Sequence, residues 1–433
     1  MKPAQGIGVN KSMNMMNKNA EKNNYFLFIA SEYKPIPGGL AECIDNLARG
    51  LIRIGNKVNI LGVLPPDDDE RLKFLKNYEE WVRPLPMEND RRPNSWLGNK
   101  CVSLLEIARC LSPTAQNFLE RRDFFRSSSQ GITKIEAILS LERPTMVIFG
   151  HLDPNLYSIA LALERMNLPY GILAHDYEIC RPHRINPFII KGKMIHGASW
   201  IAANSAHTAS LVERWRYSRN KIFILHPAIS EQVIREGIKI YPSVRDQEYT
   251  LVTICRIVKS KGIDIVLRAL KILEEKGIRY RYIVAGSGSE RSSLENLAHE
   301  LGIKSKVHFW GYIEDDRKWS LLRMAHVFIM PSRVNSRLSH EGFGMAFIEA
   351  AAFGIPGVGS RAGGIPDAIV HGETGLLVAQ ESSEELAQAL IFLYQNPEKR
   401  KKIGKAAMER ARSQFPQTNI AAHFQKEASK RIS

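Results

Sequence analysis

The stretch TLVTICRIVKSKG, residues 250–262, shows the unit from which we expect the whole fold to be built. Its first six residues are a short apolar run with β-branched side chains, which predicts a strand. The polar turn after it ends at Gly262, and a helical pattern follows. A strand, a turn with glycine and a helix in this order are typical of a parallel sheet with helical crossovers.

The same unit recurs along the chain. In the first half we expect strands at Tyr25–Ala30, Lys57–Leu61, Thr145–Phe149, Tyr170–Ala174, Trp200–Ala203 and Ile222–Leu225. In the second half we expect them at Thr250–Cys255, Tyr280–Ala285, Val307–Trp310, Val327–Met330 and Ile355–Gly359. The pattern predicts an α/β protein of two Rossmann-like, doubly wound parallel-sheet domains that face each other across a cleft.

The stretch Pro227–Tyr249 interrupts this rhythm, so we place the domain boundary at about residue 230. The first domain would cover residues 25–230 and the second residues 231–415. The interval Pro65–Arg143 is long for a loop in a compact domain. Because helical patterns occur near Val102–Leu111 and Ala115–Phe125, we predict a helical insertion at about 65–143, whose position in the first half suggests a role in acceptor binding.

The composition indicates an ordinary globular protein of two domains. Residues 1–24 are rich in Asn and Lys and lack the apolar core of a signal peptide, so we expect a disordered lead-in. No apolar run approaches the roughly 20 residues needed to cross a bilayer. The five cysteines are scattered without CxxC spacing, which argues against a disulfide framework or a zinc site. We therefore expect a cytoplasmic location.

The net charge of +15 is distributed unevenly. Between Arg181 and Lys221 the chain carries eight Lys and Arg residues against the single acid Glu213. No zinc finger, RNA-recognition signature or basic-aromatic alternation is present, so we do not expect nucleic acid as a partner. Two interpretations stay open, solvated surface charge and binding to an anionic lipid surface, which would make the protein peripheral at the inner face of the membrane.

The segment EGFGMAFIE, residues 341–349, follows the expected strand Val327–Met330 and opens a helix near Gly344. Glycines at 342 and 344 let the backbone approach a ligand, and the free N–H groups and dipole of a helix start would face an anion. Glu341 could then reach sugar hydroxyls, whereas Glu349, inside the helix, could accept from ribose hydroxyls. The alternative is a pair of surface glutamates around a loop glycine.

Two cations follow the strand at Thr250–Cys255. Arg256 directly follows the strand, and Lys261 stands just before Gly262. Cations at the edge of a cleft can neutralise the negative charge that builds on a departing diphosphate. The alternative is a solvated turn, since Lys-Ser-Lys-Gly is ordinary turn composition.

Other strand ends carry glycines or histidines. Gly38 and Gly39 open a helix and could cradle a phosphate, as could Gly286, although neither turn completes a GxGxxG fingerprint. His151 and His175 could present an imidazole to a substrate hydroxyl or could be histidines bonded inside the cleft wall. The aspartates at 67–69 and 315–316 lack histidine partners, so we predict solvated charge and no metal site.

Together these residues resemble glycosyltransferase family 4. The resemblance covers roughly Tyr25 to the C-terminus and is most specific in the second half. It is carried by Arg256, Lys261 and Gly262, by Glu341 and Glu349 with the glycines between them, and by the runs Gly354–Pro356, Arg361–Asp367 and Gly372–Leu377.

The resemblance implies a GT-B fold and a retaining, metal-independent transfer of a hexose from a nucleotide sugar, either GDP-mannose or a UDP-hexose, to a glycan or lipid-linked acceptor. It implies that no cofactor is needed, because the two cations stand in for a metal. The last helix, residues 416–433, would cross back to the first domain. Such a transfer would belong to the synthesis of a cell-surface polysaccharide or glycolipid.

The residue roles that the resemblance implies divide between the two domains. Arg256 and Lys261 would hold the diphosphate, Glu349 the ribose, and Glu341 with the 342–344 segment the sugar and its phosphate. With the strand-end residues and the basic stretch added to these roles, we predict the following sets. The donor-binding set is Gly38, Gly39, Arg256, Lys261, Gly286, Gly342, Phe343, Gly344 and Glu349, the catalytic set is His151, Glu341, Arg256 and Lys261, and the acceptor side has His175, Arg181 and Arg184.

Three departures from the family pattern stand out. Cys255 replaces the usual glycine before the arginine, Gly357 replaces a β-branched residue and is expected to weaken one strand, and the polar stretch Arg333–His340 is long. Two other functions remain as alternatives. One is a nucleotide-sugar epimerase of the same fold, and the other is a binding scaffold without catalysis.

Overall fold

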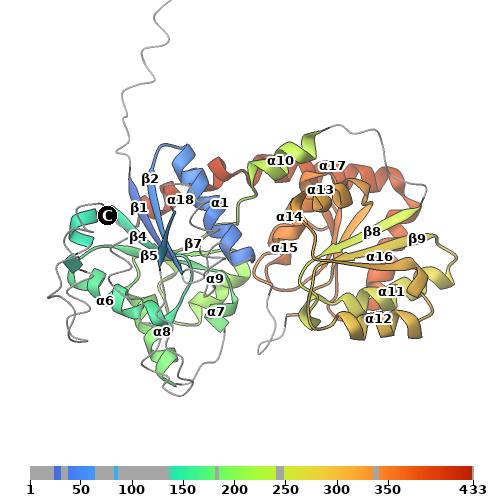
Figure 1. Cartoon of the computed structure of the whole chain (residues 1–433), viewed down its shortest axis with the longest axis horizontal. Helices are drawn as coiled ribbons and strands as arrows, with labels where there is room; N and C mark the ends of the chain where they lie inside the picture. Colours follow the sequence, from blue (N-terminus) through green and yellow to red (C-terminus); the bar gives the residue numbers. More distant parts are fainter. Residues whose placement is uncertain are drawn as a thin grey trace, which may run out of the picture.

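The computed structural model describes residues 24–30, 38–63, 82–85, 136–137, 139–180, 185–239, 248–334 and 341–431. Two parallel sheets form two α/β domains, and the helix α10 (Glu231–Ile238) lies between them along the chain. The last helices, drawn in red in Figure 1, extend from the second domain to the first. The prediction of two doubly wound domains is confirmed.

The sheet of the first domain has the strand order β3-β2-β1-β4-β5-β6-β7, with all pairs parallel. Its strands are β1 (Tyr25–Ala30), β2 (Lys57–Val63), β3 (Val82–Leu85), β4 (Met146–Phe149), β5 (Tyr170–Ala174), β6 (Trp200–Ala203) and β7 (Ile222–Ile224). Its helices are α1 (Gly39–Arg53), α6 (Tyr157–Arg165), α7 (Tyr177–Cys180), α8 (Ile185–Gly197) and α9 (Ala206–Glu213).

The sheet of the second domain has the order β10-β9-β8-β11-β12-β13, again parallel. Its strands are β8 (Tyr249–Ile254), β9 (Tyr280–Ala285), β10 (Val307–Gly311), β11 (Val327–Met330), β12 (Gly357–Ser360) and β13 (Gly375–Val378). Its helices are α11 (Ile263–Glu275), α12 (Arg291–Glu300), α13 (Asp315–Met324), α14 (Met345–Ala352), α15 (Ile365–Ala368) and α16 (Ser383–Gln395), followed by α17 (Pro397–Gln414) and α18 (Gln417–Ser429).

All eleven strands expected from the sequence coincide with observed strands to within two residues at either end. Two strands were missed, β3 and β13. The strand β3 lies inside the interval for which we predicted a helical insertion, and that prediction is wrong for these residues. Its sequence Val-Arg-Pro-Leu is short and contains proline, which is tolerated at the edge position that β3 occupies. The two helical patterns of the same interval lie outside the described residues.

The order of the strands decides where a ligand can bind. In each sheet the chain runs outward from one central strand and then returns to that strand's other side, so that β1 neighbours β4 and β8 neighbours β11. In open α/β sheets the crevice outside the carboxyl ends of such neighbours is the usual ligand site. The segments that follow these four strands contain Gly38–Gly39, His151, Arg256–Lys261 and Glu341.

The last helix, α18, joins the first domain by packing against α1. Phe424 lies in T-shaped contact with Phe26 and Trp200, and the approach of the two helices is close at Gly50. A Cβ at Gly50 would lie 2.2 Å from the carbonyl oxygen of Gln417. The helix α18 is therefore part of the core of the first domain.

Gly357, which we expected to weaken β12, lies in a strand that pairs on both sides, and its lack of a side chain has a packing role. A Cβ at this position would lie 2.7 Å from the ring of Phe347, on α14. The glycine makes room for a buried aromatic ring that also contacts Phe328 on β11. The site helix α14 is thus held against the sheet because position 357 has no side chain.

Candidate functional site

An ion pair between the ends of β8 and β11 forms the centre of the site. Lys261 Nζ donates to Glu341 Oε2 at 2.6 Å, and Ser332 Oγ donates to the same oxygen at 3.1 Å. Only 15% of the lysine side chain and 11% of the glutamate side chain are exposed. Two residues that are 80 positions apart in the chain are therefore held together by the fold.

Arg333 holds the turn that carries Lys261. Its guanidinium donates two hydrogen bonds of 2.7 Å to the carboxylate of Asp264 and one of 2.8 Å to the carbonyl oxygen of Lys259. Burial alone would raise the pKa of Asp264, but the hydrogen bonds and charge of Arg333 lower it overall. Because Arg333 follows Ser332, this planar fork ties the two loops of the site together.

Glycines shape the loop that begins at Glu341. Gly344 has φ = 96° and precedes α14, whose first turn has no side-chain cap. The amide of Gly364 donates to the carbonyl oxygen of Glu341 at 2.8 Å, and a Cβ on Gly364 would lie 1.9 Å from the carbonyl oxygen of Gly342. The glycine pair at 363–364 thus forms the support on which Glu341 is positioned.

The same loop touches the first domain. A Cβ at Gly342 would lie 2.4 Å from the carbonyl oxygen of His175 and 2.6 Å from Nδ2 of Asn204. The backbones of the two domains approach this closely because position 342 is glycine.

The other end of the segment, Glu349, lies in an ion pair with Lys318 on α13. The two charged groups are 2.7 Å apart and about one fifth exposed. Burial opposes the charge of Lys318, but Glu349, Asp315 and Glu42 together raise its pKa. Glu42 belongs to α1, so the pair lies close to the first domain.

Cys43, the next residue of α1, marks this second contact between the domains. Its Sγ lies 3.3 Å from Sδ of Met345. Burial, and then the negative charges of Glu42 and Glu349, raise the pKa of the Cys43 thiol to about 12. The start of α1 therefore faces the start of α14. A Cβ on Gly38 or Gly39 would meet no described atom within 4 Å, so the described residues leave open space beside the first turn of α1.

The two histidines lie at the ends of β4 and β5. His151 is buried, with Nε2 3.9 Å from the carboxylate of Asp153. His175 places Nε2 2.9 Å from the carbonyl oxygen of Gly150, and burial lowers its pKa. A neutral imidazole bonded to a backbone carbonyl supports the interpretation of His175 as part of the cleft wall.

Comparison with known proteins places these features in a family. The family model for glycosyl transferases group 1 matches residues 237–410. An uncharacterized glycosyltransferase of Methanocaldococcus jannaschii is 31% identical over 378 residues, covering 82% of this chain and 85% of that protein. The chain belongs to the group 1 glycosyl transferases. The sequence resemblance to glycosyltransferase family 4 is thereby confirmed.

Two further proteins are similar to this glycosyltransferase, one in sequence and one in fold. A GDP-mannose-dependent alpha-(1-6)-phosphatidylinositol monomannoside mannosyltransferase of Mycobacterium tuberculosis is 30% identical over 174 residues, which is 40% of this chain and less than half, 45%, of that protein. HepE of Anabaena, whose crystal structure contains UDP, matches with a TM-score of 0.71 at 18% identity and covers 94% of this chain and 100% of that chain. The fold is GT-B, as predicted.

The other predicted residues of the glycosyltransferase differ in their exposure and contacts. Arg256 is exposed, and its side chain makes no ion pair with any residue that the structure describes. Phe343 is only 3% exposed, because its ring stacks on His226 at 5.2 Å between ring centroids. Gly286 directly follows β9 and has φ = 133°. Its Cα lies against the carbonyl oxygen of Cys255, which follows β8. Arg181 and Arg184 lie outside the described residues.

Three residues of the glycosyltransferase site were missed at the sequence level: Lys318, Ser332 and Arg333. Lys318 lies on a helix full of charged residues and has no motif around it. Ser332 and Arg333 directly follow β11, and this position at a strand's carboxyl end was the available signal. Among the described residues, no three His, Cys, Asp or Glu side chains form a group that could hold a metal ion. No helix in the described part is long and apolar enough to span a membrane.

Proposed function

We propose that this chain transfers a hexose from a nucleoside diphosphate sugar to a hydroxyl acceptor, with retention at the anomeric carbon and without a metal ion. The observation that carries the proposal is the ion pair of Lys261 and Glu341, at the same edge of the sheet as the turn that begins at the exposed Arg256. Two cations here can neutralise a leaving diphosphate, and a glutamate beside them can accept hydrogen bonds from sugar hydroxyls.

The reaction follows from these groups. The bond from the anomeric carbon to the phosphate oxygen breaks, and its electron pair goes to the diphosphate, where Lys261 and Arg256 stabilise the charge. The acceptor oxygen bonds to the same face of the sugar, and its proton passes to the departing phosphate oxygen. His151, buried at the end of β4 in the facing domain, would lie beside the sugar and the acceptor.

Two donor classes have support from relatives. HepE, which shares the fold, was crystallised with UDP, and the mycobacterial relative is named for its dependence on GDP-mannose. We therefore propose a UDP-hexose or GDP-mannose donor and a glycan or lipid-linked acceptor. The protein would act in the synthesis of a cell-surface polysaccharide or glycolipid.

Calorimetry with UDP, GDP, ADP and their common sugars, in the presence of EDTA, tests the donor proposal. We expect one nucleotide to bind and its sugar to be transferred, and the anomeric configuration of the product, read by NMR, to match that of the donor. Inversion would contradict the retaining route. Conversion of the free nucleotide sugar to its epimer would favour the epimerase, and binding without turnover of any acceptor would favour the scaffold.

We further propose that α8 of the first domain meets an anionic lipid surface. Phe188 and Ile189 are 54% and 51% exposed, and the Phe188 ring stacks on Trp215 at 4.6 Å between centroids. Arg214 and Arg216, on either side of Trp215, are exposed. An exposed apolar pair beside cations fits the boundary between headgroups and acyl chains. Lys191, in the same basic stretch, is only 2% exposed and donates to the carbonyl oxygen of Glu178, so it belongs to the core.

The lipid proposal is tested by sedimentation with vesicles. Wild type should bind vesicles of phosphatidylcholine mixed with phosphatidylglycerol and bind pure phosphatidylcholine poorly. Replacing Arg214 and Arg216 with glutamine should weaken binding at least tenfold, because each basic residue near such a surface contributes about 1 kcal/mol. Phe188→Ser should weaken it too, whereas Tyr312→Ser, at a 68% exposed aromatic of the second domain, should not. Equal effects of the serine variants would remove the assignment to α8.

A further inference from the structure

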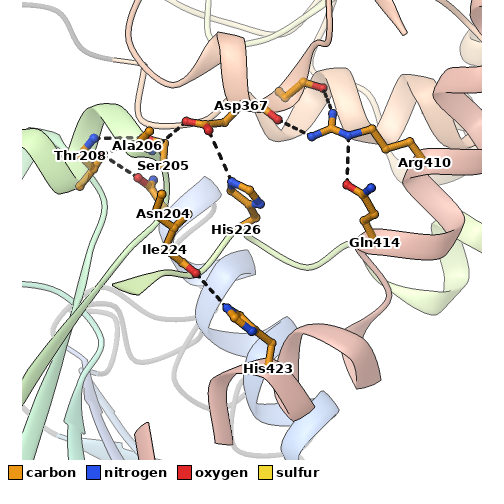
Figure 2. Close-up of polar contacts among 11 residues, drawn as sticks. Asn204, Ser205, Ala206, Thr208, Ile224, His226, Asp367, Arg410, Gln414 and His423 are labelled. Carbon is orange, nitrogen blue, oxygen red and sulfur yellow. Dashed lines mark hydrogen bonds and ion pairs between the residues drawn. The ribbon is translucent and has the colours of Figure 1, made fainter. Parts of the chain in front are cut away.

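Asp367, on α15 of the second domain, makes a hydrogen bond to the first domain. Its Oδ2 accepts from the backbone amide of Ala206 at 2.8 Å, and Oδ1 lies 3.7 Å from Nε2 of His226. Figure 2 shows the carboxylate between the start of α9 and the histidine of the segment that links the domains. A carboxylate at this place satisfies a free amide and also interacts favourably with the helix dipole.

The start of α9 is prepared for this contact from within its own domain. Ser205 Oγ caps the amide of Thr208 at 3.1 Å, and Thr208 Oγ1 donates to Asn204 Oδ1 at 2.7 Å. The amide of Ala206 is therefore not served by this cap, and its hydrogen bond goes to the other domain. Burial opposes ionisation of Asp367, but His226 and the Ala206 amide lower its pKa overall, so the carboxylate is charged at neutral pH.

A third element fixes the backbone of Asp367. Arg410, on α17, donates from its two terminal nitrogens to the carbonyl oxygens of Asp367 and Ala368, each at 2.6 Å, and from Nε to Gln414 at 3.1 Å. The two bonds to Asp367 and Ala368 use main-chain oxygens, so a change of the Asp367 side chain leaves their acceptors in place.

The segment that carries Asp367 also supports Glu341. Three residues before Asp367, the amide of Gly364 holds the carbonyl oxygen of Glu341, and Gly342 presses on His175 and Asn204 of the first domain. Asn204 belongs to the same turn that receives Asp367. Asp367 and Gly342 therefore lie on two neighbouring loops of the second domain. Both contact the same turn of the first domain, Asn204–Thr208.

We propose that Asp367 is a positioning residue that locks the Glu341 loop of the second domain against the Asn204–Thr208 turn of the first. It fixes the distance between the groups that would hold the donor and those that would receive the acceptor, a step that rests on the proposed transfer reaction. Lys261 and Glu349, which would hold the nucleotide, both belong to the second domain, so a change in the spacing of the two domains should leave them in place relative to each other.

The test uses Asp367→Ala and Asp367→Asn, with Ser382→Ala as the matched control. Ser382 caps α16 within the second domain by accepting from the amide of Glu385, so its loss removes a comparable helix cap without crossing between domains. In Asp367→Ala, hydrogen exchange of peptides covering α9 should become about tenfold faster, since a hydrogen bond to a charged group is lost. In Ser382→Ala, only α16 should exchange faster.

Kinetics provide the second measurement. In Asp367→Ala, kcat should fall about tenfold while the dissociation constant of the nucleoside diphosphate stays within about twofold. Asp367→Asn keeps an oxygen that can accept from Ala206. Its kcat and its hydrogen exchange at α9 should therefore both lie close to the wild-type values. Unchanged exchange at α9, or an unchanged kcat, would overturn the proposal. If no acceptor is ever glycosylated, the proposed function fails, but the exchange experiment still decides whether Asp367 locks the domains.

Discussion

Lys261→Ala should lower kcat/KM for sugar transfer by about 10²–10³-fold, the loss typical when one group that stabilises developing negative charge is removed. Lys261 is the only cation that the described structure holds within hydrogen-bond distance of Glu341, and it is mostly buried. Initial rates with the donor identified by calorimetry measure the effect. The binding of nucleoside monophosphates should change far less, because the lysine would face the diphosphate and the transferred sugar.

A matched control for this experiment lies two residues away. Lys259 is an exposed lysine of the same turn, so Lys259→Ala removes one positive charge without touching Glu341. Its rate should stay close to wild type. If Lys259→Ala and Lys261→Ala lose activity equally, the effect is one of general charge, and the assignment of Lys261 to the diphosphate is wrong.

Substitutions in the Lys261–Glu341 pair can lower activity by destabilising the fold as well as by removing a catalytic charge, and the two effects must be separated. Removing Lys261 alone leaves the carboxylate of Glu341, 11% exposed, without its cation, and breaking such a pair is often strongly destabilising. The double variant Lys261→Met/Glu341→Gln removes both charges and should unfold closer to the wild-type temperature than Lys261→Ala. It should nevertheless be at least as inactive, which would show that the rate depends on the charges themselves.

The sequence predicted the site best where a motif and a strand end coincide. Lys261 and Glu341 stand next to strands that a short β-branched run already reveals, and a parallel sheet brings such ends to one edge. Their pairing with each other was not predicted, because the distance between two loops depends on contacts such as those of Arg333. Gly342 was predicted to let the backbone approach a ligand, but its close approach to His175 of the first domain was not predicted.

Contacts between the domains could not be predicted in the same way. Asp367 lies in a run that the resemblance had marked, yet its partners Ala206 and His226 belong to segments without any motif. Phe343 was assigned to the donor through the backbone of the 342–344 segment, and the stacking of its ring on His226 was not predicted. Only the arrangement of the two sheets decides which face of that loop meets the ligand and which meets the other domain.

Glu349→Ala should weaken the binding of the nucleoside diphosphate by about ten- to a hundredfold, the effect expected when hydrogen bonds to a charged group are lost. The proposed partners of Glu349 are the ribose hydroxyls, so the loss should appear only with nucleotides that carry them. Calorimetry with the ribonucleotide and with its 2′,3′-dideoxy analogue separates these contributions. Wild type should prefer the ribonucleotide, and Glu349→Ala should bind the two alike.

Glu349 forms an ion pair with Lys318, so the Glu349→Ala experiment needs a control for the loss of that pair. Glu349→Ala also removes the partner that raises the pKa of Lys318, a side chain whose charge burial disfavours. Since the folded-state pKa lies above the ordinary 10.5, the stabilisation is present at lower pH and is lost only as the pH rises through the folded value, so assays at neutral pH do not titrate this group.

Two variants of α13 serve as controls for Glu349→Ala. Lys318→Met leaves the carboxylate of Glu349 in place and should keep the preference for the ribonucleotide, and Arg317→Met, at the exposed neighbouring cation, should behave as wild type. A Glu349→Ala protein that still distinguishes the two nucleotides would show that the ribose binds elsewhere. Loss of the preference in Lys318→Met with Glu349 intact would transfer the role to the lysine, because the carboxylate alone would then be insufficient to hold the hydroxyls.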